Sequence, residues 1–129
     1  MTHVGKIRIS EEVSDAISNG SPVVALESTV FSTLGLPEPS NRDALQRCIS
    51  TIHENGAVAA VTAVIDGEAR LGIDSNELDR ILSCETKVAS RDLVLSMAEG
   101  KSVGATTVSA SLAIAAAAGI KVFCTGGIG

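Results

Sequence analysis

The chain has 129 residues and a formal net charge of −5, which is enough length for one modest domain (1–129) with a buried core. Its lysines and arginines are scattered, which argues against a nucleic-acid partner, and no apolar run reaches the roughly 18 residues that a transmembrane helix needs. The polar first residues, MTHVGKIRISEE, have no signal-peptide core. We therefore expect a soluble, cytoplasmic protein without a nucleic-acid or membrane partner.

Aromatic residues and cysteines are both few. Phenylalanine supplies the only two aromatic residues, so the apolar 45% is mainly aliphatic, as in a close-packed α/β interior. Cys48, Cys84 and Cys124 lie far apart among apolar neighbours. Because there is no Cys-x-x-Cys motif and no nearby histidine pair, this spacing predicts reduced, buried thiols rather than metal ligands.

Two helices with a strand between them are expected in the first half of the chain. Ser10 and the two glutamates after it are typical of a capped helix start, and an Asn-Gly pair marks the helix end. The expected buried face of this helix carries Val13, Ala16 and Ile17. The apolar run at residues 23–26 predicts a strand buried on both faces. After a partly buried loop at residues 30–39, Ser40 opens a second helix that ends at another Asn-Gly pair.

The strongest local signal lies at residues 57–73, which read AVAAVTAVIDGEARLGI. Two extended apolar runs flank Asp66-Gly67, a dipeptide favoured in type I′ turns because both central residues need positive φ. This segment therefore predicts a β-hairpin inserted into the fold.

Helices and short strands alternate after the hairpin. Asp74 and Ser90 are expected to cap two helices, with a short extended piece at residues 86–89 between them. The buried face of the second of these helices is expected to hold Leu93, Val94, Met97 and Ala98.

The last quarter of the chain predicts a helix, a strand and a glycine-rich loop. Thr106 or Thr107 caps an Ala-rich helix, and Gly119 supplies its left-handed stop. A buried strand at residues 121–124 then leads into Thr125 and the glycines. The fold class that follows is a layered α/β/α domain with a mixed sheet and one inserted hairpin.

Two charged residues are candidates for chemistry because of their positions at strand ends. Glu27 follows four apolar strand residues, where a carboxylate is costly unless it is catalytic or paired with a helix N-terminus, and both interpretations stay open. Lys87 precedes Val88-Ala89, so its ammonium group either projects into a cleft or is solvated at the surface.

Small polar residues near the end of the chain are candidates for ligand binding. Thr106 and Thr107 precede a helix whose N-terminal N–H groups attract anions, so they bind a phosphate or are plain helix caps. In an open parallel sheet ligands lie outside the carboxyl ends of the strands, which places Thr125 against a ligand. Gly126-Gly127 is not a dinucleotide fingerprint, because no third glycine at the proper spacing and no helix follow.

Taken together, the chain resembles the pseudouridine-5′-phosphate glycosidase family. The resemblance covers nearly the whole chain from about Ser10 onward, in motif order as well as in spacing. The motifs that carry it are VVALEST (23–29), LPEPSN (36–41), NGAVAAVTAVIDGEARLGI (55–73), KVASRDL (87–93), GATTV (104–108) and AGIKVFCTGGIG (118–129).

The resemblance implies reversible cleavage of the C–C glycosidic bond of pseudouridine 5′-phosphate, which gives uracil and ribose 5-phosphate. It also implies a manganese-dependent homotrimer of α/β/α type, in which a lysine forms a covalent imine-type adduct with the opened sugar. By motif match, Glu27 would be the catalytic proton donor, Lys87 and Val108 would contact the substrate, and Thr107 and Thr125 would line the same site.

The chain also departs from the family pattern. Leu34-Gly35 stands where the family often has His-Gly, and Ala89-Ser90 replaces the more typical Ser-Arg. Beyond the motif that ends at residue 129, the family continues into a segment with a histidine, a metal-binding aspartate and the nucleophilic lysine, and Lys101 and Lys121 do not match that lysine's motif.

We therefore expect this chain to be the N-terminal part of such an enzyme, incomplete relative to the family, without a metal ligand of its own and inactive alone. Two alternatives stay open. One is a non-catalytic α/β module that binds a phosphosugar or nucleotide, and the other is an unstable remnant that folds only with partner chains or the missing half.

Overall fold

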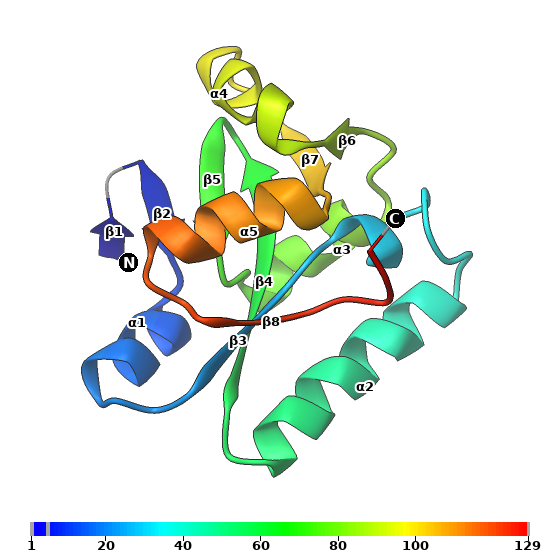
Figure 1. Cartoon of the computed structure of the whole chain (residues 1–129). Coiled ribbons are helices and arrows are strands. Elements are labelled where there is room, and N and C mark those ends of the chain that lie inside the picture. Colours follow the sequence, from blue (N-terminus) through cyan, green and yellow to red (C-terminus); the bar gives the residue numbers. More distant parts are fainter. Residues whose placement is uncertain (1, 5, 129) are drawn as a thin grey trace.

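A long central strand, β4 (Val58–Ile65), organises the computed structural model, which describes residues 2–4 and 6–128 (Figure 1). The sheet around it has the strand order β1-β2-β5-β4-β3-β8, with β7 beside β4 and β6 beside β7. The remaining strands are β1 (Thr2–Val4), β2 (Ile7–Ile9), β3 (Val23–Leu26), β5 (Glu68–Leu71), β6 (Lys87–Val88), β7 (Val103–Thr106) and β8 (Val122–Cys124). Parallel and antiparallel pairs both occur, so the expected mixed sheet is confirmed.

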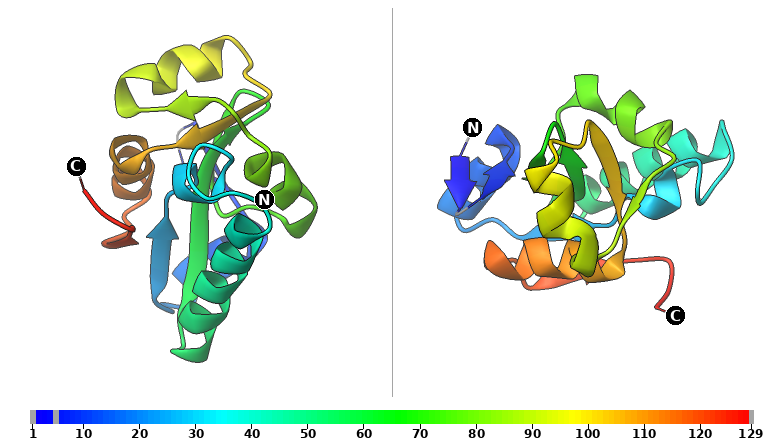
Figure 2. Two further views of the ribbon diagram at one scale, coloured as in Figure 1. Left: turned by 90° about the vertical axis from the view of Figure 1, so that its right-hand side faces the viewer. Right: turned by 90° about the horizontal axis from the view of Figure 1, so that it is seen from above.

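Helices cover both faces of this sheet (Figure 2). One apolar cluster joins the sheet to α1 (Glu11–Ser18) and α5 (Val108–Ala117). The opposite cluster joins it to α2 (Ser40–Glu54), α3 (Leu78–Leu82) and the short 3₁₀ helix η1 (Thr29–Phe31). A second 3₁₀ helix, η2 (Ser75–Glu77), precedes α3, and α4 (Ser90–Ala98) packs beside α5. The α/β/α layering expected from the sequence is therefore confirmed.

The predicted hairpin is present as β4 and β5, which pair in antiparallel register from Ile65↔Glu68 onward. Asp66 and Gly67 make the turn with φ values of +50° and +74°, as an Asp-Gly type I′ turn requires. A Cβ atom on Gly67 would also lie 2.9 Å from Gly100 Cα, so the turn packs tightly on the segment after α4. Local sequence alone was enough to predict this element.

Three short strands were missed. β1, β2 and β7 are three or four residues long, and none stands out as an apolar run in the sequence. β2 pairs in parallel with β5 and extends the sheet past the hairpin. β7, which the sequence suggested only as a lead-in to the last helix, pairs with both β4 and β6.

Several boundaries and faces also differ from expectation. Pro39 and Ala89 are the N-cap residues of α2 and α4, so Ser40 and Ser90 lie inside the first turns. The side chain of Asp74 makes no capping hydrogen bond, and a 3₁₀ turn intervenes before α3. Ile17, Ala98 and Val94 were expected to be buried, but all three are exposed, and Val94 has 78% of its surface accessible.

The predictions for the last strand and for the thiols were wrong in part. β8 lies at the edge of the described sheet, beside β3 only, and Val122 is exposed rather than buried. Cys84 is buried as expected, whereas Cys48 is half-buried and Cys124 is exposed. Within the described residues, no helix is long and apolar enough to cross a membrane.

Candidate functional site

The carboxyl ends of four strands converge at the middle of β4. β3 runs parallel to the first half of β4, with Leu26 opposite Val61, while β7 runs antiparallel to its second half, with Ala105 opposite Ala63. The two strands lie along the same side of β4 and therefore run toward each other. β8 is parallel to β3 and β6 is parallel to β7, so all four strand ends face one region.

Buried hydroxyl groups occupy the junction where β3 and β7 meet. Ser28, Thr62, Thr106 and Ser111, here called the hydroxyl cluster, each have 0% of their surface exposed. Thr62 Oγ1 lies 2.8 Å from both Thr106 Oγ1 and Ser111 Oγ, and Ser28 Oγ lies 3.1 Å from Thr106 Oγ1. The cluster links β3, β4, β7 and α5 at one point.

The hydroxyl cluster replaces ladder hydrogen bonds that two strands meeting end to end cannot make. The backbone N–H of Thr106 donates to Ser28 Oγ at 2.8 Å, and the Ser28 N–H donates to the Thr106 carbonyl at 3.3 Å. The Thr106 hydroxyl donates to the Thr62 carbonyl at 2.9 Å. Because buried polar groups are costly when unpaired, these hydroxyls stabilise the junction around which the strand ends are arranged.

Glu27 and Thr125 are brought into contact at this junction. Glu27 directly follows β3 and is buried, with 8% of its surface exposed. Thr125 directly follows β8, and its hydroxyl donates a hydrogen bond to Glu27 Oε1. The carboxylate and the hydroxyl come from residues 98 positions apart, and the parallel pairing of β3 with β8 is what places them together.

The other three predicted residues lie on the β6–β7 side of the junction. Lys87 is in β6, opposite Ala105, and its side chain is exposed. Thr107 is the N-cap of α5 and Val108 its first residue, and both are half-buried. The Thr107 N–H donates to the Val88 carbonyl at 3.0 Å, which ties the start of α5 to the end of β6. Here Glu27, Lys87, Thr107, Val108 and Thr125 are together called the strand-end rim.

The N-termini of α4 and α5 lie next to each other on the Thr107 side of the rim. The Ser90 N–H at the start of α4 donates to Ser109 Oγ of α5 at 3.0 Å, and the Thr107 and Ser109 hydroxyls lie 3.2 Å apart. Thr107 is the N-cap residue by position, as expected, but its side chain makes no capping bond to the backbone of its own helix. At the start of α4 the Ala89 N–H already donates to the Asp92 carboxylate at 3.0 Å, so the start of α5 is the end that can offer backbone N–H groups and a positive dipole end to an anion.

Sequence reasoning missed Thr62, Ser109 and Ser111, which support this site. Thr62 is a polar residue in the middle of the aliphatic strand VAAVTAVI, and Ser111 interrupts an alanine-rich helix. A hydroxyl in a strand buried on both faces needs a partner, so Thr62 carried a usable signal. The identity of its partners depended on the fold.

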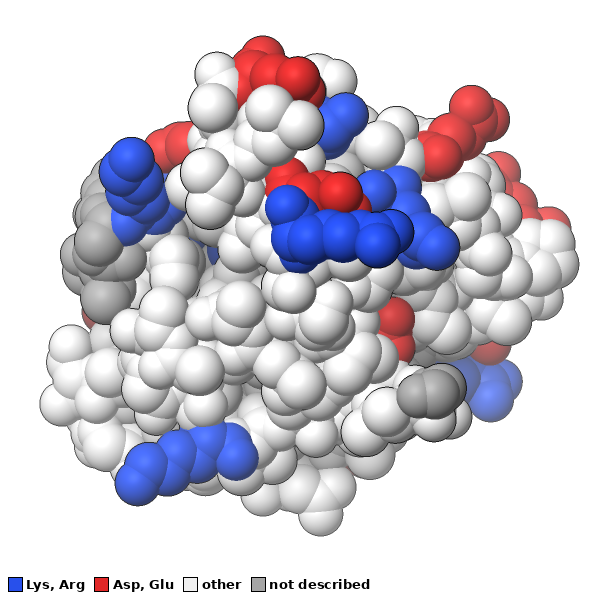
Figure 3. Space-filling view, turned by 45° about the horizontal axis from the view of Figure 1, so that its top comes forward, with Lys and Arg blue, Asp and Glu red and all other residues white. Residues whose placement is uncertain are grey.

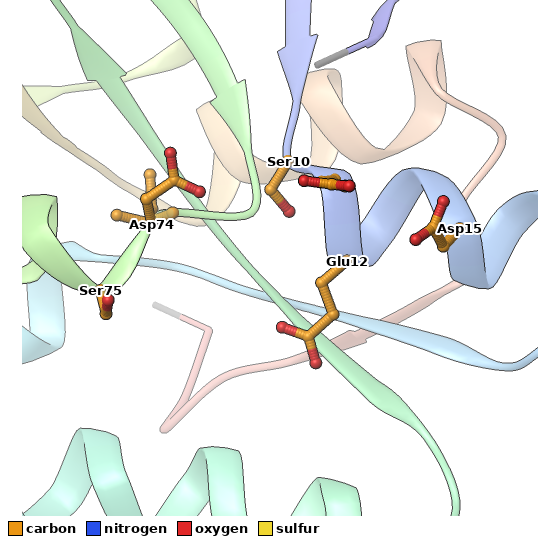
Figure 4. A pocket seen from close by; sticks show the side chains of 7 residues that line it. Ser10, Glu12, Asp15, Asp74 and Ser75 are labelled. Atoms are coloured by element: carbon orange, nitrogen blue, oxygen red, sulfur yellow. The ribbon is translucent and has the colours of Figure 1, made fainter.

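An acid-lined hollow lies elsewhere, between the start of α1 and the segment after β5 (Figure 4). The carboxylates of Asp15 and Asp74 lie at opposite sides of it and do not converge. Glu12 lies 3.1 Å from His53 Nε2 of α2 and is paired there. Among residues 2–4 and 6–128, no group of three or more His, Cys, Asp or Glu side chains could hold a metal ion.

Charged side chains are dispersed on the face that Figure 3 shows. Lysines and arginines form separate groups there, some with acidic side chains beside them, and a broad uncharged area lies between. The face in this view therefore has no continuous basic surface of the kind that binds a polyanion.

Comparison with known proteins shows what the chain is related to. Residues 12–129 match the protein family described as indigoidine synthase A like protein. The chain belongs to this family. The resemblance found in the motifs is also confirmed, because the chain is 48% identical over 127 residues to the pseudouridine-5′-phosphate glycosidase of Escherichia coli. It is 46% identical over 126 residues to pseudouridine-5′-phosphate glycosidase 2 of Rhizobium johnstonii. These matches cover 95% and 96% of the chain.

Solved structures of relatives share the fold. A TM-score of 0.83 at 34% identity relates the chain to the prealnumycin C-glycosynthase AlnA, solved in complex with ribulose 5-phosphate, and covers 97% of the chain and 40% of AlnA. The indigoidine synthase A (IdgA)-like protein of Thermotoga maritima has the same TM-score at 33% identity, over 100% of the chain and 42% of its own. The chain spans about 40% of the length of the curated relatives it matches.

Proposed function

We propose that this chain forms the Glu27 side of a site that cleaves, or in reverse forms, the C–C glycosidic bond of pseudouridine 5′-phosphate. The contact between Glu27 and Thr125 carries the proposal, because it puts a buried carboxyl group at the convergent strand ends of a chain that is 48% identical to an enzyme named for this substrate. The products are uracil and ribose 5-phosphate.

Glu27 supplies the proton that the reaction needs. Breaking a carbon–carbon bond to uracil requires a proton at the base carbon, since there is no oxygen leaving group to accept it. Thr125 donates to Oε1 and so fixes the orientation of the carboxyl group, which leaves Oε2 to transfer a proton to the base. Burial of Glu27 keeps this transfer away from bulk water.

The phosphosugar is bound on the Thr107 side of the rim. Thr107 and Val108 begin α5, and Ser109 connects this start to the start of α4, so backbone N–H groups and hydroxyls can surround a phosphate. Lys87 on the neighbouring strand adds a positive charge at the same edge. A relative of the same fold was solved with ribulose 5-phosphate, a ligand of the same class.

The lysine that forms the imine-type adduct, the manganese ion and the homotrimer implied by the resemblance are part of this proposal. The described residues do not by themselves offer a donor set for manganese, so no step here is routed through a metal. In this proposal the chain binds the phosphosugar through its own residues, and turnover depends on the additional groups.

Calorimetry with ribose 5-phosphate, together with an assay for uracil release from pseudouridine 5′-phosphate, tests the proposal on the 129-residue chain. We expect measurable affinity for ribose 5-phosphate, with little or no uracil release. Absence of binding by a folded chain would overturn the proposal. Binding with turnover that Glu27→Gln abolishes would confirm the proton donor and show that the remaining family groups are dispensable.

Glu27→Gln, made in an enzyme that has the full length of the relatives, tests the proton donor more directly. The amide keeps the shape and can still accept from Thr125, but it has no acidic proton to give. We expect a loss of at least about 10²-fold in kcat for cleavage, with ribose 5-phosphate affinity nearly unchanged. Equal losses of affinity and rate would assign Glu27 to binding, and affinity without any Glu27-dependent rate would favour the non-catalytic module.

A further inference from the structure

Two cysteines from different layers of the fold line one small hollow. The hollow lies between α2 and the β3–β8 pair and has a volume of about 250 Å³. Its lining residues are Leu26, Arg47, Cys48, Thr51, Ile52 and Cys124. None of these belongs to the strand-end rim, although Cys124 immediately precedes Thr125.

Strand register independently places Cys124 on the α2 side of the sheet. Cys124 is paired with Leu26, and paired residues on neighbouring strands direct their side chains to the same face. Leu26 packs in the cluster that contains Leu45 of α2, whereas Phe123 packs against the opposite cluster. Cys48 lies on the apolar stripe of α2 and contacts the same cluster as Leu26.

The two thiols also differ in accessibility in a way that suits stepwise oxidation. Cys124 is exposed and Cys48 is half-buried, whereas Cys84 is buried with its Sγ 3.3 Å from the Thr86 carbonyl. Burial raises the pKa of the Cys48 thiol, and the neighbouring Cys124 thiolate raises this pKa further. The second effect is consistent with the hollow that Cys48 and Cys124 both line.

We propose that Cys48 and Cys124 are a reversible oxidation site, at which a low-molecular-weight disulfide such as oxidised glutathione converts the two thiols into a disulfide bond between α2 and β8. The bond would fix the edge strand β8 at the position next to Thr125, whose hydroxyl contacts Glu27. The site therefore lies one residue away from the strand-end rim, without being part of it.

The reaction is two successive thiol–disulfide exchanges. The exposed Cys124 thiolate attacks oxidised glutathione, forms a mixed disulfide and releases one glutathione thiolate. The Cys48 thiolate then attacks Cys124 Sγ and expels the second glutathione thiolate. The two protein thiol protons end on two glutathione molecules, so the protein loses two hydrogen atoms and oxidised glutathione is reduced.

Peptide mapping after exposure of the native, reduced chain to oxidised glutathione tests this inference. Arg and Lys residues between the three cysteines place each of them in a separate tryptic peptide. We expect one cross-linked pair, which joins the Cys48 and Cys124 peptides, with Cys84 left as a free thiol. A persistent glutathione adduct on Cys124 without a cross-link, or a cross-link to Cys84, would overturn the inference.

Single-cysteine variants and a denatured control separate proximity from simple reactivity. Cys48→Ser should stop the reaction at the glutathione adduct on Cys124, Cys124→Ser should leave Cys48 a thiol, and Cys84→Ser should still give the bond. In denaturant both thiols are nearer along the chain to Cys84 than to each other, so bonds to Cys84 should increase there. An identical pattern in the native and denatured chain would show that the fold does not pair Cys48 with Cys124.

Discussion

The hydroxyl cluster and the strand-end rim are neighbours in sequence, but their side chains meet different environments. Ser28 follows Glu27, and Thr106 precedes Thr107. In each pair one residue, Ser28 or Thr106, belongs to the buried hydroxyl cluster, and its neighbour belongs to the strand-end rim. The inner member of each pair is fully buried and hydrogen-bonded across strands. The outer members lie at the strand ends, where Glu27 contacts only Thr125 in the described hydrogen-bond network and Thr107 is half-buried.

This difference shows how one strand junction serves two purposes. Opposed strands leave backbone groups that need partners, and the buried hydroxyls supply them. The same opposition brings four carboxyl ends together, so the residues that follow the strands gather into a site. Inner substitutions should therefore change stability, and rim substitutions should change ligand binding.

Replacing Thr106 by valine should give the largest effect. Valine keeps the shape but removes the hydroxyl that donates to the Thr62 carbonyl and lies near Ser28, Thr62 and Ser111. Leaving buried polar groups unpaired costs about 1–3 kcal/mol, so we expect the free energy of unfolding in urea to fall by about 2 kcal/mol. A change below about 0.5 kcal/mol would mean that the hydroxyl cluster does not stabilise the junction.

Replacing the next residue, Thr107, by valine is the matched control, for which we expect weaker ligand binding with little change in stability. Its hydroxyl lies 3.2 Å from Ser109 Oγ at the rim and makes no capping bond. We expect ribose 5-phosphate affinity to fall about tenfold in calorimetry, which corresponds to about 1.4 kcal/mol. The free energy of unfolding should change by less than about 0.5 kcal/mol. A stability loss as large as that of Thr106→Val would remove the distinction between the two regions.

The sequence predicted the outer region better than the inner one. Glu27 and Thr125 were recognisable because each follows an apolar strand, and the strand-end rule placed Thr125 against a ligand. That the two residues share one site was implied only by the family resemblance. Thr62 and Ser111 were not selected, because their partners come from other strands and helices. The assignment of a role to each rim residue came from the family motifs and remains a prediction.

The fold shows the same division between local and long-range information. The hairpin was predicted because Asp66-Gly67 determines its turn locally. β7 was missed because VGAT has no strong strand pattern and its position depends on pairing with β4, far away in sequence. The exposure of β8 was also missed, since an apolar run indicates a strand but not whether a neighbour lies on both of its sides.

A solvent-exposed ion pair gives the smallest expected effect on stability, against which the effect of the buried hydroxyl cluster can be compared. Arg80 donates hydrogen bonds of 2.8 and 3.0 Å to the two carboxylate oxygens of Asp66 in the hairpin turn. These hydrogen bonds, together with the nearby positive charge, hold the pKa of Asp66 below its usual value. Because the pKa is lowered on folding, the stabilisation is present above the usual carboxyl pKa and is lost as the pH falls through the lowered value.

Asp66→Asn tests this pH dependence without disturbing the turn, because asparagine also tolerates the positive φ of +50° at this position. Near neutral pH the variant should have a slightly lower thermal midpoint than the natural chain, since exposed ion pairs contribute little. In acid, where Asp66 is protonated, the two midpoints should coincide. A difference that stays constant at every pH would show that turn geometry, rather than charge, accounts for the effect.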